Sequence, residues 1–121
     1  MTELHGALDT GVLDELRESV GGDPEFLGEL IDEFLADAPA HIESLSRSAT
    51  SGDADAARLA AHTLKGNGRT FGANELASLC QEAEAAAAAG DLEGVLSRVD
   101  GIDREWARAR TELLALRDGR A

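Results

Sequence analysis

A histidine, a lysine and a glycine lie three and four residues apart in the segment Ala61–Gly66, which reads Ala-His-Thr-Leu-Lys-Gly. Residues at that spacing share one face of a helix, so His62, Lys65 and Gly66 would form one surface spot. A neutral imidazole is a nucleophile, and its ordinary pKa of about 6.5 leaves much of it neutral at physiological pH. The spot therefore offers a nucleophile, a cation and an unobstructed approach, which are the requirements for carrying a phosphoryl group on histidine.

The neighbours of these three residues predict a helix from about Asp53 to Thr70 with an outer and a core side. An advance of about 100° per residue places Arg58 and Arg69 near His62 on the outer side. We expect these arginines to be auxiliary cations or docking residues, and Leu59 to be an exposed docking residue. The opposite side, which would face the core, carries Ala57, Ala60, Leu64 and Phe71.

Two glycines follow within this helix, Gly66 and Gly68. Each lowers helix propensity by about 1 kcal/mol relative to alanine. We interpret both as positions where close approach to the histidine matters more than helix stability.

Each of these residues also has an ordinary interpretation. A histidine on an exposed helix face is usually a solvated residue, and a surface lysine or a helix glycine is common in any helical protein. Arg58 and Arg69 are more often solvated or paired with acids than bound to phosphate. Lys65 is the only lysine of the chain, and that fact together with the surrounding motif favours the chemical interpretation for His62.

Glycine, proline and aspartate recur at intervals along the chain and predict where the other helices begin and end. Composition favours helix over strand, because β-branched and aromatic residues are scarce. Capping and apolar spacing predict helices over about 10–20, 24–51, 53–70, 74–89 and from 92 onward, with a kink at Pro39. We predict an all-α fold, an antiparallel up-and-down four-helix bundle with a short extra N-terminal helix. Residues 1–121 would form a single domain with a core of about 9–115.

Net charge and composition limit the classes of partner and the cellular location that we expect. The formal net charge of −13 opposes binding to nucleic acid and to anionic membranes, since their phosphates would be repelled. No apolar run approaches the roughly 20 residues needed to span a bilayer. The first residues lack the basic start and apolar stretch of a signal peptide. The single cysteine, Cys80, cannot form an internal disulfide, so we expect a cytoplasmic protein with Cys80 in its core.

Several segments together resemble the histidine-containing phosphotransfer (HPt) domains of phosphorelays. The resemblance covers about residues 9–115, and it is carried by Ala61–Gly66, Phe71-Gly72-Ala73, Leu76-Ala77 and Cys80, with Asp23–Leu27, Phe34-Leu35 and Pro39 upstream. It implies that His62 is phosphorylated, that Lys65 is the adjacent cation, and that Gly66 admits a response-regulator receiver domain. The chain departs from the family pattern at Asn67, Gly68, Arg69 and Ala83, the last directly before Glu84, and these differences bear on partner choice.

The function that this resemblance implies is that of a phosphoryl carrier in a two-component phosphorelay. A receiver aspartyl phosphate would donate to His62, which would pass the group to another receiver aspartate. The partners would be receiver domains and a hybrid histidine kinase. The chain shows no nucleotide loop and no metal cluster, so we expect no ATP site, no cofactor and no metal of its own, with a divalent metal on the receiver. We expect a monomer that binds its partners weakly and transiently.

Two other classes stay open at this point. The chain can be an interaction module that binds a receiver or a kinase without carrying phosphate, although such a module would tolerate the loss of His62. It can also be an enzyme, such as a metal hydrolase in a helical bundle. The Glu-x-x-His pairs that such enzymes place on facing helices are absent from the sequence.

Overall fold

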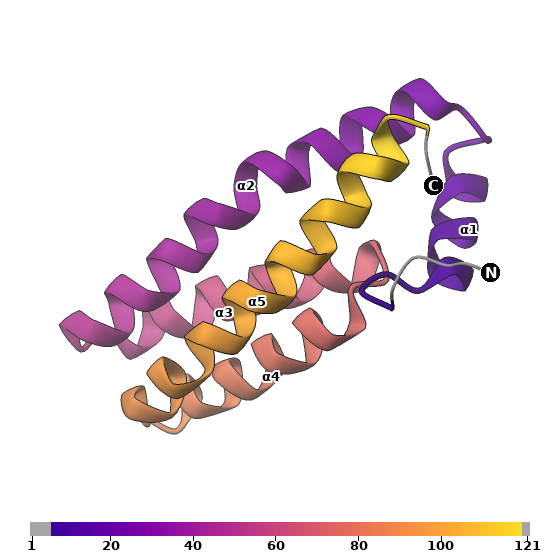
Figure 1. The fold of residues 1–121 in the computed structure, drawn as a ribbon. Coiled ribbons are helices and arrows are strands. Elements are labelled where there is room, and N and C mark those ends of the chain that lie inside the picture. The colour runs from indigo at the N-terminus through magenta and orange to yellow at the C-terminus, as the bar shows by residue number, and fades with distance from the viewer. Residues whose placement is uncertain (1–5, 120–121) are drawn as a thin grey trace.

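The computed structural model describes residues 6–119, and this range forms five α-helices without a strand. They are α1 (Thr10–Ser19), α2 (Pro24–Ser51), α3 (Ala54–Thr70), α4 (Asn74–Ala88) and α5 (Leu92–Arg117) (Figure 1). The prediction of an all-α bundle with a short first helix is confirmed, and the predicted bounds lie within one or two residues of those observed.

The four long helices form a four-cornered bundle. Each of them packs against two neighbours, so that α2 contacts α3 and α5, and α4 contacts the same two helices. Short turns between consecutive helices make them antiparallel. The α2/α5 pair therefore forms one long face and the α3/α4 pair the opposite one. The short helix α1 lies across the end of the bundle, beside the start of α2 and the turn between α3 and α4 (Figure 1).

Aspartate residues begin four of the five helices. Asp9, Asp23, Asp53 and Asp91 each accept a hydrogen bond from a backbone N–H in the first turn of the helix that follows. These bonds satisfy N–H groups that have no partner within the helix. At α2 the cap is reinforced by Pro24 at the first helical position, whose fixed φ suits a helix start. The helix bounds therefore follow from local sequence.

The core lies along the bundle axis. Its fully buried larger side chains come from all four long helices: Ile31, Leu45, Leu64, Leu76, Cys80, Val95, Ile102 and Leu113. Near the α1 end, the ring of Phe34 stacks on Phe71 at a centroid distance of 4.9 Å and meets Trp106 edge-on at 5.0 Å. Burial raises the pKa of the Cys80 thiol to about 12, as expected for a cysteine that packs as an apolar residue.

Helix α2 continues without interruption through Pro39. Proline has no N–H, so Pro39 cannot donate the hydrogen bond that the Leu35 carbonyl would otherwise receive. The proline lies on the exposed side of the helix.

The segment before α1 fixes the turn between α3 and α4. The backbone N–H of Asp9 donates to the Gly72 carbonyl at 2.8 Å, and the Asn74 amide donates to the Asp9 carboxylate at 3.2 Å. Gly72 has a φ of +74°, and a Cβ there would come within 2.9 Å of the Asp9 backbone. Only glycine fits this turn without strain. The segment before α1 is thereby bound to the α3–α4 turn.

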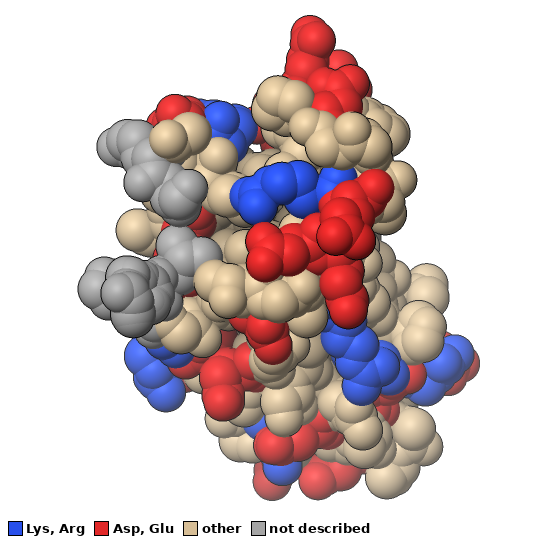
Figure 2. Space-filling view, turned by 90° about the vertical axis from the view of Figure 1, so that its right-hand side faces the viewer, with Lys and Arg blue, Asp and Glu red and all other residues tan. Residues whose placement is uncertain are grey.

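The surface carries both signs of charge. Figure 2 shows the end of the molecule on which α1 lies, where red acidic and blue basic side chains alternate between tan ones. Among the helices of the described residues, none is long and apolar enough to cross a membrane.

Candidate functional site

His62 stands on the outer side of α3, and its side chain is 59% exposed. Its Nδ1 atom lies 3.0 Å from Oε2 of Glu84, which projects from the neighbouring helix α4. The core positions that surround it in sequence, Ala60, Ala61 and Leu64, are buried. The amphipathic pattern of α3 therefore directs the imidazole into solvent, as predicted.

The contact with Glu84 determines which ring nitrogen is free. A carboxylate can only accept hydrogen bonds, so a neutral His62 that bonds to it carries its proton on Nδ1. Nε2 then has its lone pair available and no described residue bonded to it. A carboxylate in this place also stabilises positive charge on the ring. The arrangement orients the imidazole and makes Nε2 its nucleophilic atom.

Lys65 is bound to the same carboxylate. Its Nζ lies 2.6 Å from Oε1 of Glu84, and only 16% of the lysine side chain is exposed. The Oε1 atom is buried, and no donor other than Lys65 lies against it among the described residues. The hydrogen bond to Lys65 is the main cause that lowers the pKa of Glu84, with a smaller contribution from His62, while desolvation opposes the shift. The predicted cation beside His62 is present, but its charge is compensated by Glu84.

Gly66 leaves the surface beside His62 open. A Cβ built at this position would meet no atom within 4 Å, so the glycine is not required for packing within the chain. Leu59, three residues before His62, is 60% exposed, as predicted. Open backbone and an exposed apolar side chain flank the imidazole on α3, which is a surface suited to contact with another protein.

The two arginines differ from each other. Arg69 donates to the side-chain oxygen of Gln81 on α4 at 2.6 Å, so its guanidinium is held against α4. Arg58 is exposed and makes no ion pair with the described residues. Within the basic strip expected around His62, Arg69 and Lys65 are therefore held by residues of α4, whereas Arg58 makes no ion pair with the described residues.

The interpretation of Gly68 is wrong. Gly68 is buried and faces α4, where an added Cβ would lie 3.4 Å from the Ala73 carbonyl and 3.5 Å from Cβ of Ala77. This glycine allows α3 and α4 to pack closely, and it is not part of the surface around His62.

Glu84 is the site residue that sequence reasoning did not assign. A usable signal was present, because His62 and Glu84 each lie eleven residues from Ala73 at the α3–α4 turn. In an antiparallel helical hairpin, residues equally distant from the turn come to lie at the same level. His41, the other histidine of the described residues, is half-buried on α2 and forms no hydrogen bond or ion pair with His62, Lys65 or Glu84.

Within residues 6–119, no group of three or more histidine, cysteine, aspartate or glutamate side chains is arranged to hold a metal ion. The site consists of an oriented imidazole, a carboxylate that it shares with a lysine, and an open surface around them. Such a site can accept a phosphoryl group on nitrogen and release it again to an oxygen nucleophile.

Known proteins with a similar sequence are histidine-containing phosphotransfer proteins. The model of the Hpt domain family matches residues 29–118. Histidine-containing phosphotransfer protein 2 of Arabidopsis thaliana is 27% identical over 111 residues, covering 89% of this chain and 71% of that protein.

Two solved structures are similar as well. The crystal structure of histidine-containing phosphotransfer protein B (HptB) from Pseudomonas aeruginosa PAO1 matches with a TM-score of 0.85 and 32% identity, covering 94% of this chain and 96% of that one. The maize histidine-containing phosphotransfer protein ZmHP2 matches with a TM-score of 0.78 at 24% identity, over 94% and 87% of the two chains, which supports the fold.

Proposed function

This chain belongs to the Hpt domain family, and on that premise we propose that His62 accepts a phosphoryl group from the aspartyl phosphate of a receiver domain and passes it to another receiver aspartate. The observation that carries the proposal is the exposed imidazole whose Nδ1 lies against the Glu84 carboxylate. The chain is then a carrier, and both reactions use the same nitrogen.

In the first reaction, Nε2 of His62 attacks the phosphorus of the donor. A nitrogen–phosphorus bond forms while the phosphorus–oxygen bond to the aspartate breaks, and the released electron pair restores the donor carboxylate. The proton on Nδ1 stays on the ring, where the Glu84 carboxylate stabilises the positive charge that the ring gains. The second reaction reverses these steps with a different aspartate as the acceptor.

Lys65 contributes to charge stabilisation around the transferred group. Phosphoryl transfer passes through a loose transition state with negative charge spread over the equatorial oxygens. An ammonium has three donor hydrogens, so Lys65 can keep its contact with Glu84 and still direct another N–H toward a phosphoryl oxygen. Arg58, which is exposed on the same helix, can supply a weaker interaction of the same kind. The divalent metal that completes the charge compensation belongs to the receiver, and the chain needs no cofactor.

Docking uses the apolar and open surface near His62. Leu59, which is 60% exposed, and Gly66 flank the histidine on α3. Donor and acceptor receivers must occupy this surface in turn, so each interface is small and short-lived, as in other transient signalling complexes. We further propose that the protein acts as a cytoplasmic monomer, with a hybrid histidine kinase as the origin of the phosphoryl group.

Transfer of labelled phosphate tests the function. Incubation with a phosphorylated receiver should move label onto the protein as a phosphohistidine that is labile in acid and stable in base. His62→Gln should accept none, whereas the control His41→Gln should accept label at the wild-type rate. Label on the His62→Gln protein would contradict the proposal, because a residue other than His62 would then accept the phosphoryl group.

A further inference from the structure

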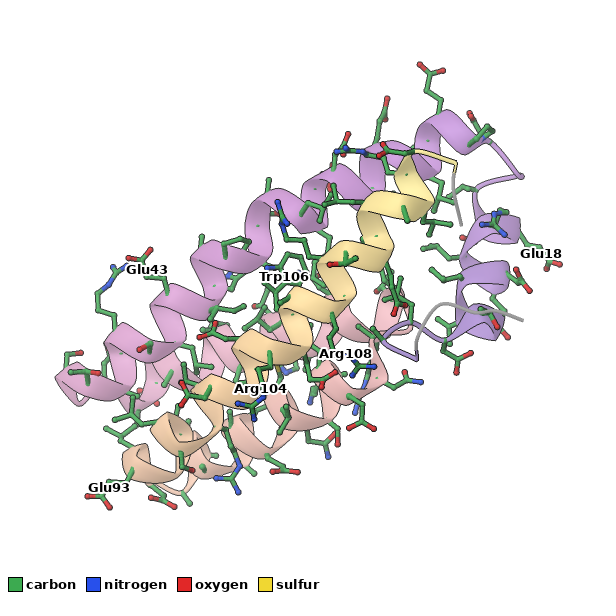
Figure 3. All side chains as sticks on the ribbon, in the orientation of Figure 1. Glu18, Glu43, Glu93, Arg104, Trp106 and Arg108 are labelled. Carbon is green, nitrogen blue, oxygen red and sulfur yellow. The ribbon has the colours of Figure 1, made fainter. Side chains whose placement is uncertain are left out.

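A shallow apolar groove lies between α2 and α5, on the opposite face of the bundle from the α3/α4 pair. Its volume is roughly 360 Å³, and its floor is formed by Pro39 and Ile42 of α2 and by Val99 and Trp106 of α5. Figure 3 shows Trp106 between these two helices. Leu96, one turn before Val99, is 40% exposed and extends the apolar surface along α5. None of these residues takes part in the His62 site.

The groove also offers polar groups to a ligand. The indole N–H of Trp106 makes no hydrogen bond with the described residues and is not sealed from solvent. On the other wall, Ser46 of α2 adds a hydroxyl group to the lining. A groove with apolar walls and a few polar groups along them resembles the recognition surfaces that bind helical segments.

The rim of the groove is acidic. Glu43 and Asp103 border it from α2 and α5, respectively. Glu43 contacts Arg47 at 3.4 Å, but both side chains are about 70% exposed, so this pair is weak. Asp103 makes no ion pair with the described residues, and the next cation on its side of α5, Arg110, lies two turns farther on and does not line the groove.

We propose that this groove binds an amphipathic helix of a partner protein, whose apolar side chains contact the groove floor and whose lysine or arginine residues contact Glu43 and Asp103. Charge decides between this occupant and a second copy of the chain. Two copies would bring acidic rims together on molecules that each carry a net charge of −13, whereas a basic helix would be attracted.

Binding there would leave His62 accessible. Because α2 and α5 form the face opposite α3 and α4, a partner in the groove and a receiver at His62 can be bound at the same time. The groove therefore suits a protein that holds or localises the carrier during transfer. The inference does not depend on phosphorylation of His62.

A synthetic helical peptide is the probe that tests this proposal. It carries leucines at helical positions i, i+3, i+4 and i+7 with flanking lysines, and a matched peptide has glutamates in place of the lysines. We expect the lysine peptide to bind in a fluorescence anisotropy titration and to change the emission of Trp106, the only tryptophan of the chain. The glutamate peptide should bind at least tenfold more weakly.

Two charge reversals locate the binding. Asp103→Lys should weaken binding of the lysine peptide at least tenfold, whereas Glu29→Lys should leave it within about twofold. Glu29 is an exposed acid on α2 that lies ten residues before Pro39 and does not line the groove. Glu29→Lys therefore makes the same change of charge outside the groove and serves as the control. His62→Gln should bind the peptide like the wild type, which separates this test from that of the relay function.

Three results would overturn the proposal. Equal weakening by both reversals would indicate general attraction to an acidic protein. Equal binding of the lysine and glutamate peptides would show that Glu43 and Asp103 do not contribute to recognition. A dimer in sedimentation experiments that Asp103→Lys abolishes would identify a second copy as the occupant of the groove.

Discussion

The α3/α4 face and the α2/α5 face of this bundle place charge in different ways. On α3 and α4, the side chains of His62 and Lys65 both contact the carboxylate of Glu84, and their neighbours are open backbone and exposed Leu59. Between α2 and α5, the acids Glu43 and Asp103 border an apolar groove without a cation bound across it.

This difference separates chemistry from recognition. On the first face, the charges are oriented by contacts within the chain, so a reacting group meets a preorganised site. On the second, Asp103 has no ion-pair partner among the described residues and Glu43 has only an exposed contact with Arg47, so these charges contribute to binding mainly when a partner supplies the opposite sign. Variants of the first face should change transfer rates, and variants of the second should change binding of a basic helix.

The largest expected effect after loss of His62 itself concerns Gly66. Gly66→Gln should slow transfer from a phospho-receiver by about a hundredfold, equivalent to about 2.7 kcal/mol, because the new side chain occupies the docking surface. Since a Cβ at Gly66 meets nothing within 4 Å, the fold should be stabilised by about 0.5–1 kcal/mol through higher helix propensity. Rapid-quench kinetics and chemical denaturation measure the two effects.

A matched glycine serves as the control for that variant. Gly28 in α2 also has open space at its Cβ position, so Gly28→Gln should give a similar gain in stability with an unchanged transfer rate. Equal transfer rates for the two variants would show that the open surface at Gly66 has no role in docking.

The next effect in size is expected at Lys65. Lys65→Ala removes one charged interaction in the transition state, and loss of about 1.5–2 kcal/mol should slow transfer by roughly tenfold to thirtyfold. Binding of the unphosphorylated receiver should change little, because the lysine side chain is mostly covered. Single-turnover transfer rates at saturating receiver measure this loss, and a variant that reacts as fast as the wild type would limit Lys65 to a structural contact with Glu84.

The smallest effect is expected for Glu84→Gln, and it depends on pH. The pKa of Glu84 is lowered chiefly by Lys65, so the folded protein gains stability from the carboxylate above the ordinary glutamate pKa of about 4.3 and loses it as the pH falls through the lowered value. At pH 7 the variant should be less stable by about 0.5–1 kcal/mol, and transfer should be a few-fold slower. The stability difference should disappear in thermal melts at low pH, and a difference that grows on acidification would contradict the assignment.

Most of the fold follows from local sequence. Aspartate caps, glycine stops and apolar spacing locate the helices, and the same spacing separates the buried Leu64 from the exposed His62 on α3. These features depend on residues within one helix, so helix bounds and buried faces can be predicted without knowledge of the neighbouring helices. The exposure of Leu59 and Gly66 was predictable for the same reason.

What escaped prediction depends on contacts between helices. Whether Gly68 faces solvent or α4 is decided by the rotation of α3 against its neighbour. The angular positions of residues around His62 on α3 do not determine that rotation. The contact of Glu84 with His62 joins residues that are 22 apart on two helices, so it depends on the register of the α3–α4 hairpin and not on a pattern within one helix. The equal distances of the two residues from Ala73 were the signal for it.

The most direct test of the account identifies the phosphorylated atom. Nitrogen-15 NMR of the protein after reaction with a phospho-receiver separates the two ring nitrogens of His62 by their coupling to phosphorus. With Nδ1 held by Glu84, the phosphoryl group should be found on Nε2 of His62 and nowhere else in the chain. A phosphoryl group on Nδ1 of His62, or on His41, would contradict the central claim that Glu84 orients this imidazole for transfer.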